Sequence, residues 1–368
     1  MDTGKDRCIA EGLVAPAQPH LPPWLIGLTV LLLCPLLAGC FEWGYYRQAA
    51  QGQWQLLSQR RDIEELILDQ GTPAALRSRL ELALKMREFA SRELHLPDNS
   101  SYRTYVELDR PYVVWNVVAT PQLSLEPVTW CFPVAGCVPY RGYFDPDDAR
   151  HFAAQMSAEG HDVQVYGVTA YSTLNWFADP ILSTFVHQRE ANLAGLLFHE
   201  LAHQQLYVKD DGTFNESFAR TVEMVGVQRW MAAHGDSGQI AAYELHQERH
   251  AVFIELLLAT RQKLEDLYRS TAADAEKLLE KEQLVARFRA EYQELKRQWG
   301  GDERFDRWVD RPLNNAHFAL VATYNRYVPA FMALLADHDD DLQRFYAAAA
   351  DLSRQSRAER HKVLQSLL

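Results

Sequence analysis

The sequence predicts a mostly helical α+β fold with a small antiparallel sheet and a long helical hairpin. Apolar residues recur every three or four positions over 45–95, and the chain after Pro180 reads as helical almost throughout. Between 103 and 168 the residues become β-branched and aromatic, which favours strands. The range 237–299 is rich in Glu, Lys, Arg and Leu, which is typical of two long helices with a solvated face.

Composition places the chain among ordinary globular proteins. It has 368 residues, of which 48% are hydrophobic and 23% charged, enough for one large domain or two modest ones. Its formal charge is -12, whereas proteins that bind nucleic acid usually carry a basic excess or a basic patch. We therefore expect no nucleic-acid partner.

The first 40 residues have the pattern of an export signal. Residues 24–37, WLIGLTVLLLCPLL, are apolar and uncharged but shorter than the roughly 20 residues that span a bilayer. The string LAGC follows at 37–40 and resembles the lipobox of bacterial lipoproteins, in which the cysteine is acylated and becomes the new N-terminus. We expect a signal peptide at 1–39 and a membrane anchor through a lipid on Cys40. An uncleaved signal anchor is the open alternative.

Two further observations concern the compartment. Residue 41 is Phe rather than Asp, which by resemblance to other lipoproteins suggests sorting to the outer membrane, facing the periplasm. Cleavage before Cys40 would leave Cys131 and Cys137 as an even pair within WCFPVAGCVPY. An oxidising compartment favours a disulfide between them, the alternative being two unrelated small apolar residues.

The strongest chemical signal is LLFHELAHQQL at 196–206. On a helix His199 and His203 are one turn apart on one face, so both imidazoles can reach one metal ion. Glu200 projects beside the ion, where a general base can take a proton from a water that the metal has acidified. A chance match to this short pattern is not rare, so the assignment needs a third ligand.

Glu216 is the candidate for that ligand. It lies on a second predicted helix in KDDGTFNESFARTVEMVG, and the intervening residues 204–215 are enough for the chain to reverse. Two histidines and one glutamate leave an open coordination position, as catalytic zinc sites do. Glu223, two turns further on the same face, is the alternative ligand or a carboxylate that orients a histidine.

These strings resemble the gluzincin peptidases, thermolysin and aminopeptidase N among them, and NESFA looks like the NExFA string of aminopeptidase N. The chain as a whole resembles a family of bacterial lipoproteins regarded as zinc aminopeptidases. That likeness rests on the lipobox, HELAH with NESFA, YGVTAYSTLNWFADPILST and LNNAHFALVATYN. It implies a gluzincin-like zinc-helix core and one Zn²⁺ per chain, with His199, His203 and Glu216 as ligands and Glu200 as base. The spacing to Glu216 is shorter than in the two named peptidases.

We expect residues 40–368 to form a single metallopeptidase domain. Its predicted parts are helices over 45–95, a β-rich part over 103–168, zinc helices over 186–232, a helical hairpin over 237–299 and C-terminal helices over 302–368. The strings YVVWNVVAT, VTWCFPV and DVQVYGV are the predicted strands, and DPDDARHFAAQMSAEG is a helix between them.

Hydrolysis of a peptide builds negative charge on the carbonyl oxygen, which a donor near the metal would stabilise. Four candidates lie in polar and aromatic strings: Tyr171, Asn314, His317 and Tyr324. For each, a structural hydrogen-bonded role is the competing interpretation. The strand-like VQVYGVTAYST could also pair with an extended substrate.

The resulting hypothesis is a zinc-dependent peptidase that acts on peptide substrates. A non-catalytic envelope lipoprotein with a structural zinc site is the alternative, but structural sites usually have four ligands and are rich in cysteine. Removal of N-terminal residues requires a carboxylate that captures the free amino group, and Glu223 and Asp179 are conceivable. Aminopeptidase specificity is therefore implied by the resemblance alone.

Overall fold

The computed structural model describes residues 40–368 apart from 133–135, 171 and 174–175. The chain divides into two compact units, 1–48 and 49–368, and each is described by itself. The predicted signal peptide, 1–39, lies outside the described residues. Helix α2, Cys40–Ser58, begins at the candidate lipid-bearing cysteine and ends in the second unit.

The helical range 45–95 is interrupted earlier than the apolar pattern predicts. The run LLSQRRDIEELILDQ is not one helix, because α2 ends at Ser58, and β1, Arg61–Asp62, and α3, Ile63–Leu68, follow. The Asp62 carboxylate accepts hydrogen bonds from the backbone N–H groups of Glu64 and Glu65, so it caps a new helix at this point. Helix α4, Ala74–Arg92, starts directly after Gly71, Thr72 and Pro73.

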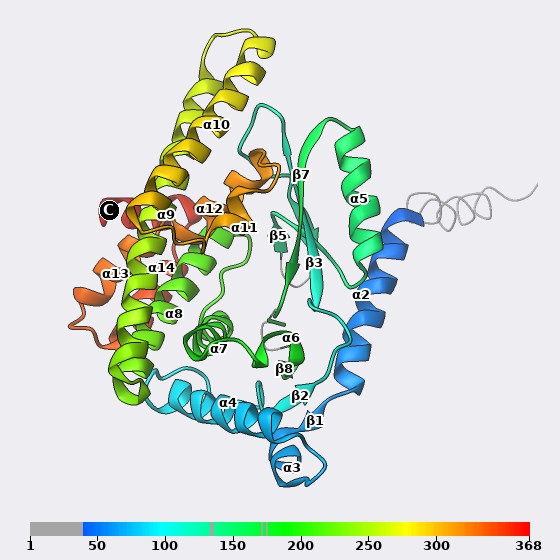
Figure 1. The fold of residues 1–368 in the computed structure, drawn as a ribbon, viewed down its shortest axis with the longest axis vertical. Helices are drawn as coiled ribbons and strands as arrows, with labels where there is room; N and C mark the ends of the chain where they lie inside the picture. The colour runs from blue at the N-terminus through cyan, green and yellow to red at the C-terminus, as the bar shows by residue number, and fades with distance from the viewer. Residues whose placement is uncertain (1–39, 133–135, 171, 174–175) are drawn as a thin grey trace, which may run out of the picture. The chain divides into compact units, whose positions relative to one another are not determined.

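The β-rich part forms small sheets, as the sequence predicts. Its main sheet has the order β6-β3-β7 and is antiparallel, with β3 at Val114–Pro121, β6 at Arg141–Tyr143 and β7 at His161–Val168. Helix α5, Pro146–Ala158, packs beside it (Figure 1). A disulfide-bonded pair, β4 at Trp130–Phe132 and β5 at Gly136–Val138, precedes β6.

A further sheet differs from the prediction, since it is not wholly antiparallel. Its order is β1-β2-β8, with β2 at Thr104–Val106 and β8 at Ile181–Leu182, and the β2–β8 pair is parallel. Helix α6, Ser183–Val186, continues directly from β8 and leads to α7, Glu190–Gln205. The sheet thus delivers the chain to the start of the helix that carries the HELAH string.

Helices α7 and α8, Gly212–His234, pack against each other in the interior of the second unit. Their apolar residues belong to the larger core cluster, and Leu197, Phe198 and Leu201 are fully buried. Phe214 and Phe218 of α8 contact the ring of Phe331 from a C-terminal helix. Burial of so many large apolar side chains makes this helix pair a rigid base for polar residues on its remaining face.

The predicted helical hairpin is present. Helices α9, Ser237–Arg269, and α10, Asp274–Gln298, run side by side (Figure 1). A second core cluster, which includes Phe253, Phe288 and Phe318, joins the hairpin to the C-terminal part. The C-terminal helices are α11, Asp306–Val309; α12, Asn315–Asn325; α13, Val328–Ala336; α14, Leu342–Ser353; and α15, Arg357–Ser366.

Candidate metal centre

Three side chains from α7 and α8 converge on one point. Nε2 of His203 lies 3.2 Å from Nε2 of His199. Oε2 of Glu216 lies 3.3 Å from Nε2 of His199 and 3.6 Å from Nε2 of His203. His203 is buried and the other two are partly buried, so the three ligand atoms form a small triangle at the edge of the core.

The size of this triangle fits a zinc ion. A tetrahedral ion with metal–ligand distances of about 2.0 to 2.2 Å separates its ligand atoms by roughly 3.3 to 3.6 Å. Two imidazoles and one carboxylate also match the donor set of catalytic zinc sites. The described geometry therefore suits a cation that all three side chains would share, with a fourth position not filled by any of them.

The pKa values of His199 and Glu216 are shifted by the charges around them, in the directions that favour a positive charge at this point. Burial alone would lower the pKa of His199, but hydrogen bonds and negative charge from Glu216 and Glu223 outweigh it and raise that pKa to about 10. Burial alone would raise the pKa of Glu216, but His203 and His199 lower it to about 2. The carboxylates thus create a strongly negative potential at the imidazoles.

The loop between the two helices places Glu216 opposite the histidines. The Asn215 side chain accepts a hydrogen bond from the Val208 N–H and donates one to the Val208 carbonyl, each at 2.8 Å. Asp211 caps α8 by accepting a hydrogen bond from the Phe214 N–H. Asn215 therefore has a structural task in the NESFA string: it ties the loop to the first turn of α8, next to Glu216.

Glu223 lies on the other side of His199 from the convergence point. Its Oε2 is 3.2 Å from Nδ1 of His199, and its carboxylate is also paired with Arg220. A Cβ atom at Gly195 would lie 3.2 Å from Oε1 of Glu223, so the glycine gives this carboxylate room. Of the two roles considered for Glu223, this geometry supports orientation of a histidine rather than ligation.

Glu200 lies next to His199 on α7 and is partly buried. Burial raises its pKa, His199 and His203 counteract that effect, and the negative charges of Glu216 and Asp179 raise it further. The side chain is therefore within electrostatic range of all three ligand candidates without belonging to their cluster.

Tyr324 of α12 is within electrostatic range of Glu216, as are three tyrosines that sequence reasoning missed. Burial raises the pKa of Tyr324 well above its ordinary value, and Glu216 and Glu200 raise it further. Tyr140 responds in the same way to burial, Glu216 and Glu200. Burial and then Glu216 raise the pKa of Tyr207, while Tyr166, with burial as the main cause, reaches about 12. All four phenols are therefore within electrostatic range of Glu216, and the Tyr207 ring centroid lies 6.4 Å from that of His203.

The other predicted contacts lie elsewhere. Asn314 caps α12 and donates a hydrogen bond to the Val163 carbonyl, and His317 contacts Asn314 and the Trp308 ring. Both belong to the first turn of α12, whereas Tyr324 lies near its end, on the order of 10 Å or more along the helix axis. Their described contacts support the structural interpretation. Tyr171 lies outside the described residues.

Asp179 is buried and accepts hydrogen bonds from the Thr173 N–H and hydroxyl, from Ser172 and from Gln204.

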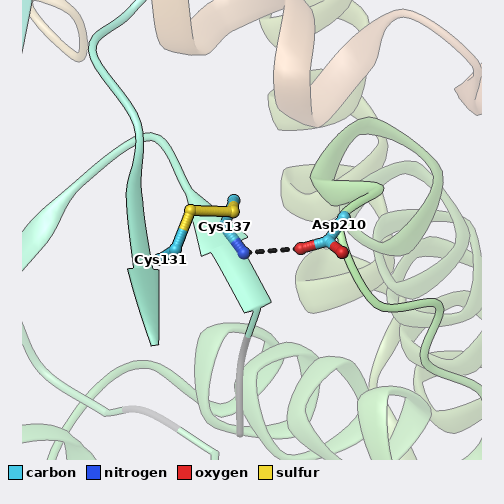
Figure 2. The surroundings of a disulfide bond; sticks show 3 residues. All are labelled: Cys131, Cys137 and Asp210. Carbon is cyan, nitrogen blue, oxygen red and sulfur yellow. Dashed lines mark hydrogen bonds between the residues drawn. A yellow bond between two sulfur atoms is a disulfide. The ribbon is translucent and has the colours of Figure 1, made fainter. Parts of the chain in front are cut away.

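Cys131 and Cys137 form a disulfide across β4 and β5, and the Cys137 N–H donates a hydrogen bond to Asp210 in the α7–α8 loop (Figure 2). The Cys40 side chain is not among the described features.

Comparison with known proteins identifies one family. A family model described as "Putative aminopeptidase" matches residues 44–364, which is most of the chain. No curated protein matches the chain, and neither does a solved structure.

Proposed function

The chain belongs to the putative aminopeptidase family, and on that premise we propose that it is a zinc-dependent peptidase. The observation that carries the metal part of the proposal is the triangle formed by His199, His203 and Glu216, whose edges measure 3.2 to 3.6 Å. Its donor set and size suit a catalytic zinc ion. A structural zinc site would need a further protein ligand, and the cluster found among the described residues has three members.

In this proposal a bound zinc ion would act as a Lewis acid toward the scissile carbonyl and lower the pKa of water. Glu200 is the residue that takes a proton from the attacking water and passes it to the nitrogen that leaves. Its raised pKa suits this task, because a carboxyl group that is easier to protonate can both accept and return the proton. Glu223 holds the His199 ring in position by accepting a hydrogen bond at Nδ1.

The phenols of Tyr324 and Tyr140 are the proposed donors to the carbonyl oxygen. Both are raised in pKa by burial and by the same two carboxylates, so both stay protonated near neutral pH. A neutral phenol can donate a hydrogen bond to the oxygen on which negative charge develops.

Strand β7 offers an edge along which an extended peptide could lie. Among the described strands it pairs with β3, and the Val163 carbonyl on its other edge accepts a hydrogen bond from Asn314. Because backbone groups alternate between the two edges of a strand, Val165 and Gly167 face the same way as Val163. Tyr166 lies between them and is within electrostatic range of Glu216.

The decisive test combines metal content with turnover. Glu200→Gln should retain one zinc per chain and lose peptide hydrolysis, because the variant removes the base and keeps the ligands. His199→Ala should lose zinc and activity together. If Glu200→Gln cleaved a peptide library as fast as the wild type, the catalytic assignment would be wrong. A wild-type chain that bound zinc and cleaved no peptide would favour the non-catalytic alternative.

We also propose that a lipid on Cys40 anchors the mature protein in the outer membrane, facing the periplasm. The support is the LAGC string at 37–40 with the apolar segment before it. Cys40→Ala should lose both the acyl group and the cleavage before residue 40, whereas a Cys8→Ala control should keep both. A wild-type chain that keeps residues 1–39 and carries no lipid would indicate a signal anchor instead.

A further inference from the structure

The disulfide-closed hairpin β4–β5 docks on the loop that joins the two metal-binding helices. The N–H of Cys137 donates a hydrogen bond of 2.6 Å to Oδ1 of Asp210, as Figure 2 shows. Asp210 belongs to the loop 206–211, between the end of α7 and the start of α8. A contact at this place acts on the segment that joins the helix of the histidines to the helix of Glu216.

The contact is close on the hairpin side as well. Gly136 has a φ of +74°, and a Cβ atom there would lie 2.4 Å from Oδ1 of Asp210 and 2.8 Å from Cγ of Lys209. Asp210 itself has a φ of 64°, in the left-handed region. The backbone of the hairpin at Gly136 thus packs directly against the side chains of Asp210 and Lys209, and a larger residue at position 136 would not fit.

Residues of the candidate site flank this contact on both sides. Tyr140 lies between β5 and β6, and β6 is held in the main sheet by the pairing of Arg141 with Val117. Tyr207 lies in the α7–α8 loop itself, and its ring centroid is 6.4 Å from that of the candidate ligand His203. The chain around Tyr140 is therefore fixed at one end by the sheet and at the other by the disulfide and Asp210.

We propose that the Cys131–Cys137 disulfide is a positioning element that makes the oxidised chain the active form, by holding Tyr140 and the α7–α8 loop against the metal centre. The inference rests on the peptidase function proposed above. A dithiol reductant would cleave the S–S bond with two electrons and two protons, giving two cysteine thiols and its own disulfide. Neither sulfur belongs to the candidate ligand cluster, so reduction would leave the metal ligands in place.

Reduction is expected to lower activity because the disulfide restricts the conformational freedom of the hairpin. It closes a loop with a sequence separation of 6 residues, and opening it restores conformational entropy to the hairpin. The hydrogen bond to Asp210 then has to hold a mobile segment, which a single bond does poorly. A chain kept reduced before export would be poorly active, and oxidation outside the cytoplasm would complete the site.

The first test compares the oxidised mature protein, the dithiol-treated protein and Cys131→Ser/Cys137→Ser. We expect all three to hold one zinc and to keep the same far-ultraviolet circular dichroism, while kcat falls roughly tenfold or more in the two forms without the disulfide. Equal kcat in the three forms would overturn the proposal. Loss of zinc on reduction would overturn it too, because the disulfide would then support the metal site as a whole.

A double-mutant cycle tests whether the effect acts through Tyr140. If it does, removing the disulfide in a Tyr140→Phe background should lower kcat little beyond the effect of Tyr140→Phe itself. If the two changes instead lowered kcat independently, so that their effects multiplied, the assignment would be contradicted.

Asp210 provides a matched pair of variants. Asp210→Asn keeps an acceptor and tolerates the positive φ, whereas Asp210→Gly keeps the backbone freedom and removes the acceptor. We expect Asp210→Gly to lower kcat as reduction does and Asp210→Asn to preserve it.

Hydrogen exchange separates this proposal from the peptidase proposal. Reduction should speed exchange of the Cys137 amide and of amides in the loop 206–211, whether or not a substrate is known. Faster exchange in a chain that cleaves no peptide would leave the positioning role standing and remove the peptidase function. Unchanged exchange together with unchanged turnover on reduction would remove the positioning role alone.

Discussion

Oε2 of Glu223 lies 3.2 Å from Nδ1 of His199, on the opposite side of the imidazole from Glu216. A carboxylate at Nδ1 keeps the proton on that nitrogen and leaves the Nε2 lone pair directed at the point where the three ligand atoms meet. One helix, α8, thus supplies both the proposed third ligand and the group that orients the first.

This division of roles predicts different zinc affinities for two variants of α8. Glu216→Ala should bind zinc far more weakly than the wild type, because it removes a ligand atom. Glu223→Ala should bind one zinc with an affinity lowered about 10- to 100-fold, since the ligands remain and only the orientation of His199 is lost. Competition with a chelator measures both. Equal losses would assign the two carboxylates the same role, and a greater loss in Glu223→Ala would exchange them.

Tyr324→Phe should lower kcat by roughly 100-fold and change KM little, because the phenol acts on charge that develops only in the transition state. Tyr268→Phe is a matched control, since the Tyr268 hydroxyl donates to Asn315 on the hairpin side of α12. The control should retain kcat and lose at most a modest amount of stability. Steady-state kinetics of both variants decide the matter; a rise in KM alone for Tyr324→Phe would assign the phenol to substrate binding instead.

Asp211 predicts an acid-dependent stability. Burial alone would raise its pKa, but hydrogen bonds from His361 and Arg360 outweigh burial and hold the pKa below its ordinary value. Nε of Arg357, at the start of α15, lies 4.0 Å from Oδ1 of Asp211. A depressed pKa contributes stability above the unfolded value of about 3.9, and this stability is lost as the pH falls toward the folded pKa.

Asp211→Asn should therefore be less stable than the wild type at pH 7, by up to about 3–5 kcal/mol, because it leaves Arg360 buried without its anion. The gap should narrow below about pH 4, where the carboxylate of the unfolded wild-type chain begins to be protonated while that of the folded chain is still charged. Denaturant unfolding at several pH values measures this gap. A gap that stayed constant from pH 7 to pH 3 would show that the charge of Asp211 does not stabilise the fold.

Asp179 gives a prediction about specificity. Its negative charge, with that of Glu216, raises the pKa of Glu200, which places the Asp179 carboxylate within electrostatic range of the reacting groups. If Asp179 attracts the free amino group of a substrate, N-acetylated peptides should have a lower kcat/KM than free ones. Asp179→Asn should then slow cleavage of free peptides and leave acetylated ones unchanged. Equal cleavage of free and acetylated peptides by the wild type would indicate an endopeptidase.

Local patterns in the sequence predicted the parts of this protein that depend on short spacing. Histidines four residues apart on an apolar helix, a Cys pair six residues apart, and an alternating β-branched strand at 161–168 are each visible within one segment. The apolar period continues through Asp62, so it does not predict the break between α2 and α3. The chain breaks there because Asp62 caps a new helix and because β1 pairs with β2. This pairing involves residues 104–105, which lie too far along the chain for a local pattern to show.

The sequence by itself determined that His199, Glu200 and His203 are candidates for a metal site and its base, because the helical repeat sets their spacing along one segment. Only the tertiary structure decided that Glu216 faces the histidines, that Glu223 lies on the Nδ1 side of His199, and that Tyr207 lies beside His203. The physical reason is that these groups come from segments far apart in the chain. Their meeting depends on how helices, sheet and disulfide pack together, and no periodicity records that packing.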